Sequence, residues 1–154
     1  MEKLPHRHLT TLTLEVDFPK IVPIGAIPAG RRGIAPVAGG RFEGDRLQGT
    51  VRPGHDWFVT RADGSLLIDV RLTLETDDGA MVYLTYQGTM RGSAEAMNRF
   101  RKGEQLQPQN YQLHVVAKAE CGDPRYSWLN DAIIVGIGEQ TLRGPVYHLF
   151  EVGA

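Results

Sequence analysis

The sequence contains little cysteine and no long hydrophobic run. Cys121 is the single cysteine among 154 residues, which excludes a disulfide within the chain and a cysteine-rich zinc site. No segment approaches the about 20 consecutive apolar residues with which a helix spans a bilayer. The stretch MEKLPHRHLTTLTLEVDF also lacks the apolar core of a signal peptide. We therefore expect a cytoplasmic protein without a membrane partner.

An excess of one charge is absent as well. The 17 lysines and arginines nearly balance the 18 aspartates and glutamates, and the formal net charge is -1. Proteins that bind nucleic acid concentrate positive charge in a patch or stripe, and the sequence shows no such block. Nucleic acid is therefore not an expected partner.

Motifs for metals, cofactors and covalent catalysis are also missing. The five histidines show no ligand spacing with a carboxylate, and His6 and His8 lie in a segment, 1–8, that we expect to be frayed. The sequence has no GxSxG motif for a nucleophilic serine. GGRFEG at 39–44 is not GxGxxG, and no strand-to-helix junction follows it. The sequence therefore predicts neither a metal site nor a bound cofactor.

Glycine and proline, in contrast, are abundant and separate short β-rich segments. Residues 9–18, LTTLTLEVDF, alternate apolar and polar side chains as a half-buried strand does. One helix is predicted at 93–103, where Ser93 can cap the first turn. The Gly- and Pro-rich segment 19–36 is expected to be a loop or lid. Further strands are expected near 39–44, 46–52, 56–61, 66–76, 80–89, 111–120, 132–140 and 145–152.

These eight or nine antiparallel strands predict an all-β fold with one short helix. Closing the sheet removes its exposed edges. A closed or nearly closed antiparallel β-barrel, as a single domain over 1–154, is therefore favoured over a sandwich. We expect Gly44 and Asp45 to form one of its tight hairpin turns.

The strand LLIDVRLTLE, at 66–75, carries candidate chemistry on one face. Ile68 and Val70 belong to an apolar row, while Asp69 and Arg71 belong to the opposite row. If the apolar row packs outward against another layer, Asp69 and Arg71 point into the barrel. If the apolar row forms the core, as is usual in antiparallel sheets, they are surface charges.

The first arrangement supports a cofactor-independent enzyme that isomerises, cyclises, hydrates or eliminates on a small, largely apolar metabolite. A carboxylate would act as general base, an arginine would hold an enolate or carboxylate, and a tyrosine would donate a proton. The candidates are Asp69 or Glu43 as base, Arg71 and Arg41 for the oxyanion, and Tyr126 or Tyr86 as donor.

Three alternatives remain open. Asp69 and Arg71 could form a structural ion pair. The barrel could be a non-catalytic binding or carrier protein for a hydrophobic ligand. It could also be a structural oligomer subunit that uses the apolar face of the strand at 66–76.

Taken together, three longer stretches resemble one family. PVAGGRFEGDRLQGTVRPGHDW, ADGSLLIDVRLTLETDDGAMVYLTYQG and GDPRYSWLND are similar to the bacterial and fungal family called domain of unknown function 3237, or uncharacterised protein family 0311. The resemblance runs over residues 9–152. It implies a small antiparallel barrel, somewhat like the allene oxide cyclase and lipocalin type, that associates as a homodimer or larger homo-oligomer. It implies no established reaction.

The resemblance also supports a site. The family pattern matches Asp56, Trp57, Asp69, Arg71, Tyr126, Trp128 and Asn130. The chain departs from the pattern at Tyr86-Gln87, where an Asn-Arg pair is usual, and at His55, where glycine or alanine is usual, so Tyr86 and His55 are candidates for substrate specificity. The candidate residues for substrate binding are Arg41, His55, Asp56, Trp57, Tyr86, Trp128 and Asn130.

Overall fold

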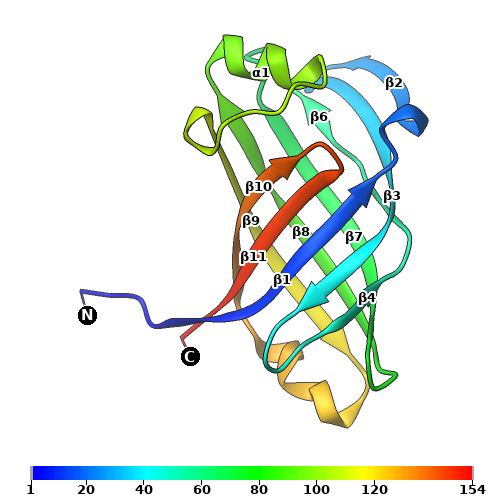
Figure 1. The fold of residues 1–154 in the computed structure, drawn as a ribbon, viewed down its shortest axis with the longest axis vertical. Coiled ribbons are helices and arrows are strands. Elements are labelled where there is room, and N and C mark those ends of the chain that lie inside the picture. Colours follow the sequence, from blue (N-terminus) through cyan, green and yellow to red (C-terminus); the bar gives the residue numbers. More distant parts are fainter. Residues whose placement is uncertain (1, 154) are drawn as a thin grey trace.

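The computed structural model describes residues 2–153 and shows a mainly β protein whose strands form a single sheet (Figure 1). The strands are β1 (His6–Val16), β2 (Val22–Ile27), β3 (Gly30–Glu43), β4 (Gly49–Val51), β5 (Gly54–Asp56), β6 (Val59–Thr60), β7 (Leu66–Thr76), β8 (Met81–Gly92), β9 (Tyr111–Cys121), β10 (Ile134–Thr141) and β11 (Gly144–Val152). The helical segments are α1 (Ala94–Arg101) and the 3-10 turns η1 (Phe18–Lys20), η2 (Pro108–Asn110) and η3 (Pro124–Asp131).

The sheet closes on itself, which confirms the predicted antiparallel barrel. Along the sheet the strand order is β1-β11-β10-β9-β8-β7-β4-β3-β2, and a further pairing of β1 with β3 completes the ring. β4, β5 and β6 successively fill one position between β3 and β7. Eight strand positions thus form the barrel, and β2 extends it beyond β3. Closure leaves the barrel strands without a free edge.

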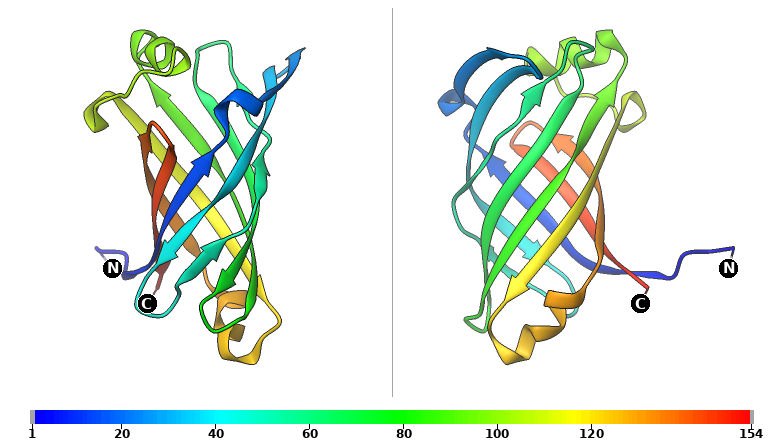
Figure 2. Two further views of the ribbon diagram at one scale, coloured as in Figure 1. Left: turned by 45° about the vertical axis from the view of Figure 1, so that its right-hand side comes forward. Right: turned by 180° about the vertical axis from the view of Figure 1, so that it is seen from behind.

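The two ends of the barrel differ. α1 and the β2–β3 hairpin lie at one end, and η3 lies at the other (Figures 1 and 2). The start of β1 and the end of β11 pair with each other and extend away from the barrel wall (Figure 1). No helix within residues 2–153 is long and apolar enough to cross a membrane.

The core lies inside the barrel because apolar side chains recur at every second strand position. In β7, Ile68, Val70, Leu72 and Leu74 are all buried. Leu12 and Phe42, directly opposite each other on β1 and β3, are fully buried where the ring closes. Burying such side chains contributes about 1.5–3 kcal/mol each, so the apolar row of each strand determines which face points inward.

The segment expected to be a loop, 19–36, instead contains β2 and the first half of β3. Pro23 is tolerated in β2 because this strand stands at the barrel rim and pairs on one side only, with β3. His6, Arg7 and His8, expected to be frayed, pair with residues 150–152 of β11. Residue 1, which belongs to the same predicted segment, lies outside the described residues.

The turn predicted at Gly44 and Asp45 is also different, because β3 and β4 are joined by residues 44–48. Thr10 holds this longer loop by donating a hydrogen bond from its hydroxyl to the carbonyl of Leu47, at 3.0 Å. The helix agrees more closely with expectation: the Ser93 hydroxyl accepts a hydrogen bond from the N–H of Ala96 at 3.0 Å and caps α1.

Gly39 and Gly40 allow the barrel to close. Their φ angles are +155° and +154°, values that residues with a side chain rarely adopt. A Cβ on Gly40 would overlap the backbone carbonyl of Thr13 on the neighbouring β1. The pairing of β1 with β3 shifts register beside this point, between Glu15 and Val16. The glycine pair therefore allows the bend and the close approach that complete the ring.

Candidate functional site

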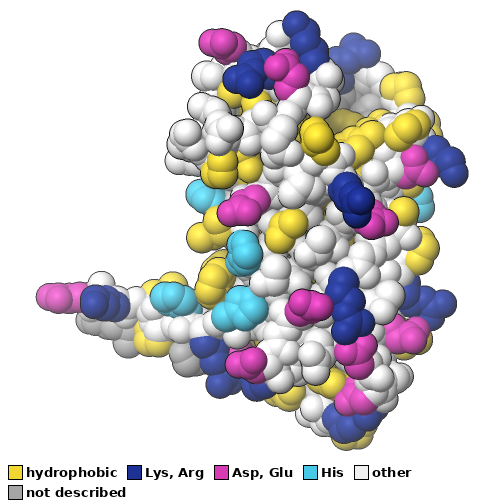
Figure 3. All heavy atoms as spheres, viewed as in Figure 1, with side chains coloured by type: hydrophobic (Ala, Val, Ile, Leu, Met, Phe, Trp, Pro, Cys, Tyr) yellow, Lys and Arg dark blue, Asp and Glu magenta, His cyan; other side chains and the backbone are white. Residues whose placement is uncertain are grey.

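A cavity of about 660 Å³ occupies the end of the barrel near α1. Its walls come from the inner faces of the strands, and its rim comes from η1, the end of α1 and the β10–β11 turn. Figure 3 shows a hollow with apolar walls at this end of the molecule. The apolar wall residues include Leu14, Val37, Phe58, Ile68, Val70 and Leu106. Sites for small molecules typically combine such walls with a few polar groups.

Asp56 is the carboxylate inside this cavity. Between β3 and β7, the chain is interrupted at Arg52 and Pro53, and Pro53 has no N–H to donate to a ladder. Val51 lies opposite Leu74, but Asp56 lies opposite Val70, so the pairing with β7 shifts by one residue across this gap. A one-residue shift exchanges the two faces of a strand. It places Asp56 on the inner face.

The cavity makes Asp56 a group that can give and take a proton near neutral pH. The pKa of Asp56 is raised from 3.8 to about 7, mainly by burial and to a smaller extent by the charge of Asp69. The hydrogen bond that Asp56 Oδ1 accepts from the N–H of Asp69, at 3.1 Å, and the charge of Arg32 act in the opposite direction. A carboxyl group with a pKa close to the working pH is suited to general acid–base catalysis.

Two tyrosines stand near Asp56. Tyr86 of β8 and Tyr147 of β11 line the cavity, each with 2% of its surface exposed. Their ring centroids are 5.0 Å apart at an interplanar angle of 59°. Burial raises the pKa of both phenols, and the negative charge of Asp56 raises both further. Both tyrosines therefore remain protonated hydrogen-bond donors at neutral pH.

Asp69 and Arg71 lie on the outer face of the barrel. Their predicted catalytic roles required both side chains to point into the barrel, and the structure does not place them there. The row that contains Ile68 is buried in the core, and the alternation of β7 turns Asp69 and Arg71 outward. The Gln87 amide donates to Asp69 at 3.4 Å. The Arg71 guanidinium lies 5.3 Å from the centre of the Trp57 ring. Neither residue lines the cavity.

His55 and Trp57 accompany Arg71 on the outer surface. The register shift that turns Asp56 inward turns its two neighbours outward. The rings of His55 and Trp57 lie 5.7 Å apart, and His55 is directly opposite Arg71 on β7. Of the HDW segment, only Asp56 lines the cavity.

Arg41 and Glu43 also face solvent, because Phe42 occupies the inward position between them. Arg41 donates two hydrogen bonds to the carboxylate of Asp77, at 2.9 and 2.7 Å, and lies 3.8 Å from Glu43. These contacts make an exposed ion-pair cluster on the barrel wall. The predicted role of Glu43 as a base inside the cavity is therefore not supported by its position.

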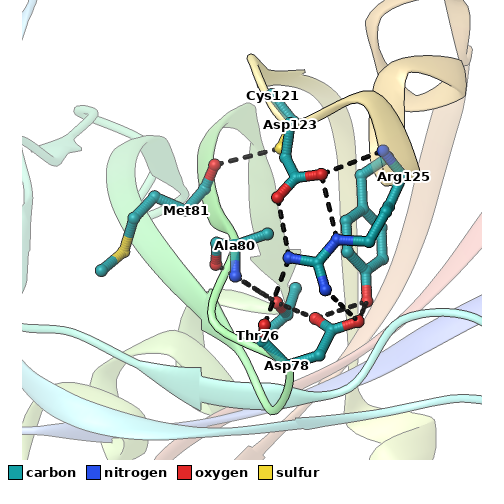
Figure 4. Close-up of polar contacts among 8 residues, drawn as sticks. Thr76, Asp78, Ala80, Met81, Cys121, Asp123 and Arg125 are labelled. Atoms are coloured by element: carbon teal, nitrogen blue, oxygen red, sulfur yellow. Dashed lines mark hydrogen bonds and ion pairs between the residues drawn. The ribbon is translucent and has the colours of Figure 1, made fainter.

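Tyr126 lies at the opposite end of the barrel from the cavity. Its hydroxyl is 2.9 Å from each carboxylate oxygen of Asp78. Arg125 joins the same cluster through ion pairs with Asp78 at 3.3 Å and with Asp123 at 2.8 Å (Figure 4). The cluster fastens η3 to the β7–β8 turn.

Trp128 and Asn130 contribute to this closed end. The Arg46 guanidinium lies 4.3 Å from the centre of the Trp128 ring. The Asn130 amide accepts from the N–H of Cys121 at 3.0 Å and donates to the Cys121 carbonyl at 2.9 Å. Trp128 and Asn130 are therefore positioned to hold the η3 segment, away from the cavity.

Thus the cavity contains two of the predicted site residues, Asp56 and Tyr86, and one that the sequence interpretation missed, Tyr147. A signal for Tyr147 was present: it shares the inward row of its strand with Leu149, and both are buried. Only the closed barrel shows which aromatic residues of different strands come together.

The fold and the cavity together define a small antiparallel β-barrel with an interior of ligand size. Residues 5–152 match the family described as protein of unknown function (DUF3237). The chain belongs to this family, which confirms the resemblance seen in its motifs.

Relatives from several bacteria share most of the chain. A UPF0311 protein of Rhodopseudomonas palustris is 30% identical over 134 residues, which cover 86% of this chain and 86% of that protein. A UPF0311 protein of Clostridium acetobutylicum is 27% identical over 136 residues, which cover 88% of this chain and 85% of that protein.

Solved structures share the barrel. The crystal structure of the conserved protein of unknown function RPA1785 from R. palustris has a TM-score of 0.92 at 27% identity and covers 99% of both chains. A β-barrel-like protein from Acinetobacter baumannii has a TM-score of 0.85 at 32% identity, over 99% of this chain and 98% of that one. An enzyme from Penicillium herquei has a TM-score of 0.73 at 17% identity, over 99% and 96% of the two chains. This last likeness concerns the fold alone.

Proposed function

We propose that the protein is a cofactor-independent acid–base enzyme that acts on a small, largely apolar molecule bound inside the barrel. The observation that carries the proposal is a carboxyl group, Asp56, whose pKa is raised to about 7 in a cavity that it shares with two buried tyrosines. Groups with such shifts, placed in a cavity, mark candidate catalytic sites.

In the proposed reaction, ionised Asp56 takes a proton from a carbon or hydroxyl group of the substrate. Tyr86 and Tyr147 donate hydrogen bonds to the oxygen on which negative charge develops. Protonated Asp56 then returns the proton to another atom of the substrate in isomerisation or cyclisation, or to the leaving group in elimination. Hydration is the reverse of elimination, with Asp56 taking the proton from the water molecule that adds. None of these reactions gains or loses electrons.

Solvent-deuterium exchange tests this role. Ligands are first found by the rise in melting temperature that a library of small ketones and phenols produces. Each ligand is then incubated with the protein in D₂O, and its C–H signals are followed by NMR. We expect exchange with the unmodified protein, and loss of most exchange in Asp56→Asn and Tyr86→Phe with the rise in melting temperature retained.

Glu75→Gln is the matched control, because it removes a carboxylate from the outer face of the adjoining strand β7, outside the cavity. Exchange that survives Asp56→Asn, or that Glu75→Gln impairs equally, would contradict the acid–base proposal. Retained binding without any exchange would favour the second candidate, a carrier. The cavity of about 660 Å³ with mainly apolar walls supports that candidate as well.

We propose a second copy of the chain as the protein partner, as the family resemblance implies. Val116, Val135 and Ile137 form an exposed apolar face on β9 and β10, where Val116 and Val135 are directly opposite each other. Val116 is 64% exposed and Ile137 54%. Contiguous exposed apolar side chains mark protein interfaces.

Light scattering tests the oligomer. The unmodified protein is expected to have at least twice the mass of the chain, and Val116→Lys with Ile137→Lys is expected to reduce it to the monomer mass of 17.1 kDa. Thr50→Lys, at an exposed position of β4 away from β9 and β10, is the control. A monomeric unmodified protein, or an oligomer that persists in the double variant, would contradict this interface.

A further inference from the structure

We propose that the mouth of the cavity binds an anionic oxygen group, such as a carboxylate or sulfonate, carried by the molecule whose apolar body fills the barrel. Arg31 and Arg101 are the residues that would hold it. The inference deepens the proposed function by naming the substrate class. It rests on that function only for what happens at Asp56.

A second hollow, of about 650 Å³, adjoins the cavity at its mouth. Its lining comes from the β2–β3 hairpin and from the end of β6. Ile21, Phe58, Thr60 and Arg101 line both spaces. A molecule could therefore extend from the apolar cavity into a hollow lined by four arginines: Arg31, Arg32, Arg61 and Arg101.

Arg31 lies at the rim of the barrel, where it is exposed and lines the second hollow. Gly33, Ala35 and Val37 form the buried row of β3, and Arg31 continues that row toward the rim because successive positions on one face are two residues apart. Across the ladder it lies opposite Thr60, which lines both hollows. A few polar groups placed at the edge of an apolar pocket are what orients a bound molecule.

Two of the four arginines already have partners. Arg32 donates to the carbonyl of Trp57 at 2.5 Å. Arg61 donates to the hydroxyl of Ser65 at 2.8 Å and lies 3.8 Å from the carboxylate of Asp63.

Arg31 and Arg101 are different. Within residues 2–153, no carboxylate lies within ion-pair distance of either guanidinium. Arg101 makes one long contact, 3.4 Å, with the side chain of Asn98. Glu104 at the cavity rim pairs with Arg99 at 3.4 Å. Figure 3 shows Lys and Arg side chains at this end of the molecule, interspersed with Asp and Glu.

The arrangement separates the charged end of a ligand from its apolar end. Guanidinium groups bind oxyanions through paired N–H donors. Phe58 lines both hollows. Its ring occupies the space that a Cβ at position 33 would need, so Gly33 makes room for it. The apolar body would thus pass Phe58 toward Tyr86, while the anionic group stays among the arginines.

A matched pair of fluorescent probes tests the charge preference. 8-Anilinonaphthalene-1-sulfonate and N-phenyl-1-naphthylamine share the same aromatic body and differ by the sulfonate. We expect the sulfonate probe to bind the unmodified protein about tenfold more tightly. Arg31→Gln and Arg101→Gln are each expected to weaken the sulfonate probe about tenfold and to leave the neutral probe unchanged.

Controls separate the mouth from other surfaces. Arg52→Gln removes an exposed arginine that pairs with Glu75 at 3.6 Å, outside both hollows, and should change neither affinity. Ile137→Thr tests for probe bound on the exposed β9–β10 face and should also change neither. 1-Naphthoate is expected to displace the sulfonate probe, whereas acetate at equal concentration is not, because it lacks the apolar body.

Equal affinities of the two probes, or equal weakening of both by Arg31→Gln and Arg101→Gln, would overturn the inference. So would weakening of the sulfonate probe by Arg52→Gln or Ile137→Thr, or displacement by acetate. These failures leave Asp56-dependent deuterium exchange intact. Loss of that dependence would overturn the proposed acid–base function and leave the anion preference intact, so the two can fail separately.

Discussion

The free energy of unfolding of the unmodified protein is expected to fall by about 2–4 kcal/mol between pH 4 and pH 7 because of Asp56. Asp56→Asn is expected to abolish this fall. The variant keeps the oxygen that accepts the N–H of Asp69 at 3.1 Å and cannot ionise. Its free energy of unfolding should therefore exceed that of the unmodified protein most clearly at pH 7 and above.

The sign follows from the raised pKa of Asp56, about 7 against an ordinary 3.8. Below pH 3.8 the carboxyl is protonated in both the folded and the unfolded protein. Between the two pKa values the unfolded chain releases the proton while the folded protein retains it, so rising pH favours unfolding. Above about pH 7 both states are ionised and the difference becomes constant.

Urea unfolding at pH 4.5, 5.5, 6.5 and 7.5 measures this difference. The useful quantity is the variant's free energy of unfolding minus that of the unmodified protein, since the other titrating groups then cancel. Glu75→Gln, on the outer face of β7, supplies the control. A constant difference across the four pH values would show that the cavity does not raise the pKa of Asp56.

Gly40→Ala is expected to destabilise the protein by about 3 kcal/mol or more. The new Cβ would overlap the carbonyl of Thr13, and the backbone φ of +154° is unfavourable for alanine. Relief would require β1 and β3 to separate at the point where the barrel closes. Leu14 and Val37, which lie beside this point, line the cavity, so probe affinity should fall as well.

Gly122→Ala is the matched control, because a Cβ at that position has no neighbour within 4 Å. Urea unfolding of both variants, with probe titration below the transition, gives the comparison. If Gly40→Ala costs no more stability than Gly122→Ala, close approach at Gly40 is not what limits closure.

The strands and the barrel could be predicted because they depend on local periodicity. In LTTLTLEVDF the alternation of apolar and polar residues predicts a strand with one buried face. Many short strands in a small domain favour closure of the sheet. The same reasoning did not predict β2, because Pro23 and Gly25 in VPIGAI resemble a loop. Pairing with β3 on one side was enough to make it a strand.

Motif matching identified Asp56, and it also selected Asp69, Arg71 and Tyr126, which lie outside the cavity. The place of a residue within a sequence motif does not show whether its side chain points into the barrel or out of it. Tyr126 shares its motif with Trp128 and Asn130 and fastens the closed end of the barrel through Asp78.

The sequence by itself determined the alternating faces of the long strands such as β1 and β7, the capped helix and the family. The tertiary structure decided which of those faces the barrel encloses at each point. One shift of register between Val51 and His55 turned Asp56 inward and its neighbour Trp57 outward. Closure then brought Tyr86 and Tyr147, 61 positions apart in the chain, to a ring distance of 5.0 Å. Both outcomes depend on pairing between distant strands, which no local pattern of residues specifies.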